Sequence, residues 1–123
     1  MADPRHILGQ AAEDATARWL AACGWRVLGR RQRAVGGGEI DLLALDPEAM
    51  LVAVEVRARR SRRLGAPEAS IDLRHVARMR STLASVAARG AVAHRGLRVD
   101  IVTAEPEPDV PGRWRLRRTP AVG

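Results

Sequence analysis

The order of hydrophobic patterns predicts an α/β domain with a mixed sheet: a helix, three strands, a second helix and one or two further strands. Residues 39–45 and 51–59 are two apolar segments separated by a five-residue connection with Asp and Pro, which is typical of a hairpin. A helical pattern over residues 72–89 stands between this hairpin and an apolar segment at 97–104. That arrangement favours a helical crossover to a parallel strand.

The remaining elements follow from periodicity and from glycine positions. Residues 7–23 carry apolar side chains at helical spacing, and Gly24 is a natural helix stop. Residues 25–28 are a short strand, and three consecutive glycines at 36–38 predict a turn. The second helix has an apolar stripe of Val76, Met79, Leu83 and Val86.

Length limits the organisation of the chain. The 123 residues make one domain, 1–123, with its core over about residues 7–104. A loop with three prolines covers residues 105–112. Residues 113–118 are a basic C-terminal segment and a short edge strand, after which we expect a frayed tail.

Composition favours a polyanionic partner, with nucleic acid before a membrane surface. There are 21 basic residues against 14 acidic ones, a net charge of +7, and every basic residue is Arg. The absence of Lys excludes a Lys general base, a Schiff base and a phosphate-loop Lys. The absence of Tyr and Phe excludes a nucleic-acid reader that stacks bases on those rings.

The chain shows neither an export signal nor an apolar stretch of membrane-spanning length, so we expect no membrane partner. Cys23 is the single cysteine, and His6, His75 and His94 are scattered, without the spacing of a zinc site. We therefore expect a cytoplasmic protein in a reducing compartment.

Acidic residues lie inside the apolar strands of the hairpin. Alternation puts Ile40 and Leu42 on one face of the first strand and Asp41 on the other. It puts Glu55 and Arg57 together on one face of the second strand. If Leu45 pairs with Leu51, Asp41 lies directly opposite Glu55, where two like charges destabilise the sheet unless a cation bridges them. Mg²⁺ suits such a pair of carboxylates.

Alternatives remain at this point. The same register places Glu39 opposite Arg57, whereas a register that pairs Leu45 with Ala53 places Asp41 opposite Arg57 in a plain salt bridge. Glu13, at the border of the first helix's apolar face, is a further metal ligand or an ordinary solvated charge. Asp100 is expected on the outer face of its strand.

Four short motifs resemble the YraN-like family of uncharacterised bacterial proteins. They are GxxAE from Gly9, GEIDL from Gly38, VEVRxR from Val54 and RVDIV from Arg98, in the same order and with matching separations. That family is similar to the restriction-endonuclease-like superfamily with the PD-(D/E)XK signature, and especially to archaeal Holliday-junction resolvases. The resemblance implies an αβββαβ core. Junction resolvases act as dimers, so it also raises a homodimer as a candidate assembly.

The resemblance implies a metal-dependent endonuclease acting on DNA, in which Asp41, Glu55 and Glu13 bind Mg²⁺ or Mn²⁺. Arg57 stands where the superfamily has Lys, and Ile40 stands where the signature has Pro. A guanidinium stays protonated, so Arg57 can grip a phosphate but cannot act as a base. The base is then a metal-activated water or a carboxylate, either Glu39 or Glu13.

An arginine-rich loop, residues 57–63, follows the strand that carries Glu55. We expect its side chains, with two from the second helix, to hold a nucleic-acid backbone. A solvated arginine-rich loop is the alternative. His75 is expected to be a helix-surface histidine. The rival function is a non-catalytic nucleic-acid-binding protein on a nuclease fold. The predicted nucleic-acid contacts are Arg59, Arg60, Arg62, Arg63, Arg74 and Arg78.

Overall fold

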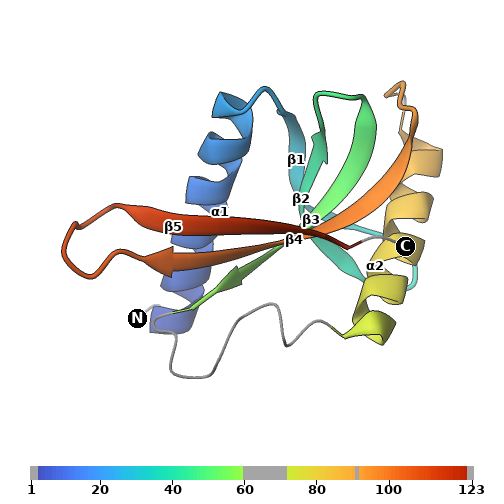
Figure 1. The fold of residues 1–123 in the computed structure, drawn as a ribbon. Coiled ribbons are helices and arrows are strands. Elements are labelled where there is room, and N and C mark those ends of the chain that lie inside the picture. Colours follow the sequence, from blue (N-terminus) through green and yellow to red (C-terminus); the bar gives the residue numbers. More distant parts are fainter. Residues whose placement is uncertain (1–2, 60–71, 91, 122–123) are drawn as a thin grey trace.

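A five-stranded sheet lies between two helices in the computed structural model of the protein, which describes residues 3–59, 72–90 and 92–121 (Figure 1). The sheet order is β1-β2-β3-β4-β5. Helix α1 covers one face and α2 covers the other. The elements in chain order are α1 (Pro4–Ala22), β1 (Arg26–Arg33), β2 (Glu39–Leu45), β3 (Met50–Ala58), α2 (Leu73–Arg89), β4 (Gly96–Pro106) and β5 (Trp114–Ala121).

The two helices begin and end where the sequence supplies capping residues. The Asp3 side chain accepts the N–H of Arg5 before α1, and the Asp72 side chain accepts the N–H of Arg74 before α2. Gly24, with φ of +88°, follows α1 in a backbone conformation that other residues rarely adopt. The predicted helices are confirmed, with α1 starting three residues earlier than expected.

The mixed sheet is confirmed as well. Strands β1, β2 and β3 pair antiparallel, β3 and β4 pair parallel across the α2 crossover, and β5 returns antiparallel to β4. Three strands are longer than predicted. Strand β1 extends to Arg33, β4 runs from Gly96 to Pro106, and β5 pairs with β4 as far as Ala121. The expected frayed tail after Arg118 is therefore wrong over residues 119–121, because the ladder with β4 satisfies that backbone.

Each face of the sheet has its own core. The stripe of α2 is buried as predicted, against Leu51, Ala53, Val99 and Ile101. Helix α1 packs with Ala17 and Leu20 on the opposite face; its strand partners are Leu42, Val52, Val54 and Val102. Since buried apolar side chains alternate along β3, this strand is covered on both sides and forms the centre of the domain.

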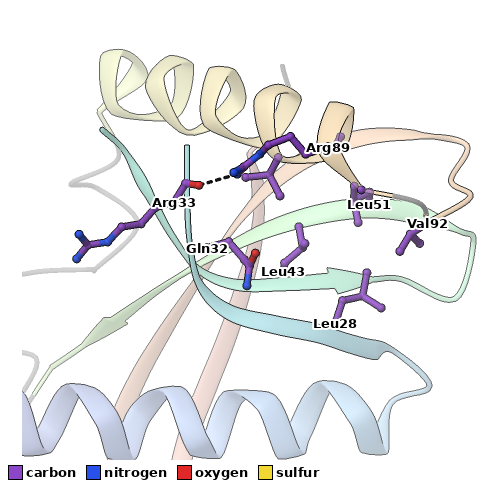
Figure 2. A pocket seen from close by; sticks show the side chains of 10 residues that line it. Leu28, Gln32, Arg33, Leu43, Leu51, Arg89 and Val92 are labelled. Atoms are coloured by element: carbon purple, nitrogen blue, oxygen red, sulfur yellow. Dashed lines mark hydrogen bonds between the residues drawn. The ribbon is translucent and has the colours of Figure 1, made fainter. Parts of the chain in front are cut away.

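The second half of α2 leaves an apolar pocket of about 320 Å³ against β1 and β2. Figure 2 shows Leu28, Leu43 and Leu51 lining it. At its rim, Arg89 Nη2 donates to the carbonyl oxygen of Arg33 at 2.6 Å, which fixes the end of α2 to the end of β1 (Figure 2).

Candidate active site at the end of the β2–β3 ladder

The pairing of β2 with β3 stops just before Asp41. The ladder runs from Leu45↔Leu51 to Leu42↔Val54, which confirms the register that the hairpin predicts and shows that the shifted register is wrong. Beyond Leu42, a side chain replaces the backbone as the acceptor for β3: Asp41 Oδ2 accepts the N–H of Val56 at 2.9 Å. The confirmed register leads to Asp41 opposite Glu55, but the ladder pairs end at Leu42, so that position stays a prediction.

The start of β2 turns toward α2. Ile40 is buried in the core beneath α2, whereas Leu42 is buried in the core beneath α1. The expectation that both share one face is therefore wrong. Gly38 explains the turn, since it lies so close to the Thr82 hydroxyl of α2 that a Cβ there would clash. Glu39 forms an ion pair with Arg33 of β1 at 2.9 Å. The β2–β3 ladder pairs end before the predicted position of Glu39 opposite Arg57, which stays a prediction.

Glu55 is held from two elements. Arg57, on the same face of β3, donates from Nε to Glu55 Oε2 at 3.0 Å. His75, in the first turn of α2, places Nε2 against Glu55 Oε1. The three side chains are 18%, 15% and 33% exposed for Glu55, Arg57 and His75 respectively. Glu55 is thus a half-buried carboxylate with both oxygens engaged.

His75 is the site residue that sequence reasoning missed. It is not a plain surface histidine, because α2 directs it onto Glu55. The position of His75 in the sequence could have indicated a contact with the sheet. It immediately precedes Val76, the first residue of the buried stripe, so it lies at the border of the face that packs on the sheet.

Glu13 approaches from α1. Its side chain is 15% exposed and lies 3.9 Å from Arg31 Nε of β1. Burial raises the pKa of Glu13 above its usual value, against the lowering effect of Arg31 and Arg30. The interpretation as an ordinary solvated helix charge is therefore wrong. Its neighbour Asp14 faces Arg30 in an exposed ion pair.

Burial, together with three nearby carboxylates, raises the pKa of Asp41. Burial raises the pKa of Asp41 to about 6, the Val56 N–H lowers it, and the charges of Glu13, Glu55 and Glu39 raise it again. A divalent cation would relieve this mutual repulsion, and carboxylate oxygens are ligands that Mg²⁺ and Mn²⁺ accept. Within residues 3–59, 72–90 and 92–121, no three His, Cys, Asp or Glu side chains are grouped closely enough to hold a metal as they stand. The predicted ligands are coupled electrostatically without forming a closed cluster.

Three of the predicted nucleic-acid contacts, Arg59, Arg74 and Arg78, lie in the described part of the chain. Arg59 continues β3, and its N–H donates to the carbonyl of Ala104 at 2.8 Å. Arg74 and Arg78 are exposed on α2. Arg60, Arg62 and Arg63 lie outside the described residues, so the arginine-rich loop is placed only at its start.

The acid of the RVDIV motif belongs to a separate, buried charge network. Asp100 is fully buried, which corrects its expected position on the outer face of its strand. Arg98 donates to both of its oxygens, at 2.7 and 3.0 Å, and Arg118 of β5 donates at 2.8 Å. Both guanidinium groups also lie over the ring of Trp25. These hydrogen bonds raise the pKa of Arg98, and the network fastens β5 and Trp25 to β4.

Two helices on opposite faces of a mixed five-stranded sheet, with an acid at the start of β2 and another near the end of β3, define a restriction-endonuclease-like αβββαβ core. The chain belongs to UPF0102, an uncharacterised protein family, whose model matches residues 12–104. This confirms the resemblance to the YraN-like family.

Relatives of similar length support the assignment. A UPF0102 protein of Symbiobacterium thermophilum is 39% identical over 110 residues, 89% of this chain and 90% of its own. One from Moorella thermoacetica is 39% identical over 98 residues, 80% of each chain. One from Bifidobacterium longum is 34% identical over 97 residues, 77% of each. Neither α1 nor α2 is long and apolar enough to cross a lipid bilayer.

Proposed function

We propose that this protein is a metal-dependent endonuclease that hydrolyses phosphodiester bonds in DNA, branched or single-stranded, in the cytoplasm. One observation carries the proposal. The Asp41 carboxylate accepts the Val56 N–H and feels the charges of Glu13, Glu55 and Glu39, in a chain whose net charge is +7. An acidic centre that favours a divalent cation, in a basic protein that favours a polyanion, suits metal-assisted attack on a phosphodiester.

Each side chain has a distinct part in this reaction. Asp41 and Glu55 would hold Mg²⁺ or Mn²⁺, and the bound cation would stabilise charge on the scissile phosphate and make the attacking water more acidic. Arg57 would grip a non-bridging phosphate oxygen. Of the two candidate bases, Glu13 is better suited than Glu39. Its raised pKa makes Glu13 a stronger proton acceptor than an ordinary carboxylate, and Glu39 is paired with Arg33 at 2.9 Å.

His75 acts through Glu55. It lies against one carboxylate oxygen of Glu55 while Arg57 binds the other, so the carboxylate is oriented before a cation or substrate arrives. Arg59, Arg74 and Arg78 would hold the neighbouring backbone phosphates, which carry no sequence information.

A non-catalytic nucleic-acid-binding protein is the second candidate. Two observations favour it. Both oxygens of Glu55 already have protein partners, and Arg57 replaces the Lys of the nuclease signature. In that case the acidic centre would be a structural ion-pair cluster, and binding to DNA would need no divalent cation.

Cleavage assays with matched variants separate the two functions. Purified protein with Mn²⁺ should nick branched or single-stranded DNA, whereas Asp41→Asn and Glu55→Gln should abolish nicking and retain DNA binding. Asp109→Asn and Glu48→Gln are the matched controls, because both acids are exposed and lie in turns outside the acidic centre. Binding without cleavage on every DNA form would leave the non-catalytic function, and cleavage that survives both active-site substitutions would contradict the proposed site.

A further inference from the structure

A polar hollow of about 340 Å³ lies between the β1–β2 turn and α2, apart from the acidic centre. The turn contributes the three glycines, and α2 contributes Arg78, Ser81 and Ser85. No acidic side chain is among the described residues that line it. The hollow therefore offers hydrogen-bond donors and a positive charge.

The turn presents bare backbone to this hollow. Gly36, Gly37 and Gly38 have φ of +96°, +100° and +93°, a region that residues with a Cβ rarely adopt. A Cβ at Gly36 or Gly37 would meet no neighbouring atom, so the space above both peptides is open. Two hydrogen bonds tie the turn, from Ala34 N to Gly38 O and from Gly37 N to Ala34 O. Neither bond uses the N–H of Gly36 or Gly38. Backbone N–H groups exposed by glycine turns are donors that bind anions, and the N–H groups of Gly36 and Gly38 flank the one that Gly37 uses within the turn.

Helix α2 presents a matching donor face. Arg78, Ser81 and Ser85 are spaced by three and four residues, so they share one side of the helix. Thr82, on the adjoining side, supports the turn: it packs against Gly38 and donates its hydroxyl to the carbonyl of Arg78 at 3.0 Å. A guanidinium, two hydroxyls and peptide N–H groups are the donors that proteins use for phosphate oxygens.

The same helix connects the hollow with the acidic centre. His75, which lies against Glu55, precedes Arg78 by three residues and Ser85 by ten, or about 5 and 15 Å along the helix axis. One strand of a duplex rises about 3.4 Å per nucleotide. A strand that follows α2 would therefore reach the hollow one to four nucleotides from the acidic centre.

We propose that this hollow, the glycine–serine subsite, binds a backbone phosphate of a nucleic-acid strand a few nucleotides from Asp41 and Glu55. The choice of nucleic acid as ligand rests on the proposed function. The subsite itself requires only a phosphodiester, and it would set the path of the strand along α2.

Metal-free binding measurements test the subsite separately from cleavage. Fluorescence anisotropy of a labelled single-stranded oligonucleotide in EDTA, over a salt series, gives both affinity and salt slope. Arg78→Ala should weaken binding about 3- to 10-fold and reduce the salt slope by about one. Arg80→Ala is the matched control, since Arg80 is exposed on the opposite side of α2, and it should change affinity less than twofold.

A second pair of variants tests position instead of charge removal. Ser85→Asp places a carboxylate in the hollow and should weaken binding at least 10-fold. Ala84→Asp places one on the neighbouring exposed side of α2 and should have a clearly smaller effect.

Equal losses of affinity within each pair, or no loss from Arg78→Ala and Ser85→Asp, would overturn the subsite, as would an absence of DNA binding by the unmodified chain. Cleavage of DNA together with equal losses of affinity within each pair would contradict the subsite and support the nuclease. Unequal losses within both pairs, with no cleavage, would support the subsite and contradict the nuclease.

Discussion

The carboxylate of Asp41 accepts the backbone N–H of Val56 at 2.9 Å, in the first position beyond the β2–β3 ladder. A side chain of β2 thus accepts a backbone N–H of β3 beyond the point where the backbone of β2 has turned toward α2. The same hydrogen bond holds the carboxylate in a place where burial and neighbouring acids oppose its ionisation. Ionised Asp41 therefore lowers the free energy of unfolding.

Replacement of Asp41 by Asn should therefore stabilise the fold near neutral pH. The pKa of Asp41 is about 6 in the folded protein and 3.8 as its ordinary value. Ionised Asp41 is destabilising above the folded pKa, and this penalty disappears as pH falls from about 6 to below 4. Asn retains an oxygen for the Val56 N–H. We expect Asp41→Asn to be more stable by about 1–3 kcal/mol at pH 8, and the difference to vanish once the pH is well below the ordinary pKa of 3.8.

Urea denaturation of both proteins across this pH range measures the difference. Asp109→Asn, in an exposed turn, should show no pH-dependent gain. A stability difference for Asp41→Asn that does not vary with pH would contradict the assigned cause.

Divalent cations should stabilise the natural protein through the same carboxylate. A cation that binds only the folded state at about 100 times its Kd adds about 2.7 kcal/mol. Mn²⁺ at pH 7.5 should therefore raise Tm by several degrees, and Asp41→Asn should abolish the shift. Thermal denaturation with and without EDTA measures this effect. An equal Mn²⁺ shift in the variant would place cation binding elsewhere.

Loss of His75 should reduce cleavage without reducing affinity for DNA. Residues that orient metal-binding carboxylates affect activity by about 10- to 100-fold when removed. We expect His75→Ala to show a loss of this size, and His75→Gln, whose amide can still donate to Glu55, to recover part of it. Single-turnover cleavage and anisotropy report the two quantities. A fall in DNA affinity equal to the fall in rate would assign His75 to substrate binding instead.

Asp100 should be among the most costly carboxylates to remove. It is fully buried with Arg98 and Arg118, and its removal leaves Arg98 in a partly buried site without its principal partner. We expect Asp100→Ala to destabilise the protein by about 3–5 kcal/mol. Glu107→Ala is the control, because its pairing with Arg115 is more exposed and should contribute less than about 1 kcal/mol. Comparable losses in urea denaturation would show that the buried network contributes no more than a surface pair.

Much of the framework could be predicted because it depends on neighbours in sequence. The α2 stripe and the glycine turn follow from spacing, and both are observed. Spacing left two hairpin registers open, and the structure has the one that pairs Leu45 with Leu51. The length of β5 could not be predicted, because its last residues are apolar or polar without alternation and are held by β4. The buried state of Asp100 was equally hidden, since its strand pattern does not reveal that Arg98 and Arg118 both reach it.

The sequence by itself determined the order of elements, the family and the identity of the acids, and its lack of Lys removes a Lys base from any mechanism. Only the tertiary structure decided how those acids are used. Asp41 meets Val56 across 15 residues and His75 meets Glu55 across 20, and both contacts depend on where a ladder ends and how a helix sits on the sheet. Such contacts arise from packing between distant segments, which periodicity along one strand or helix does not encode.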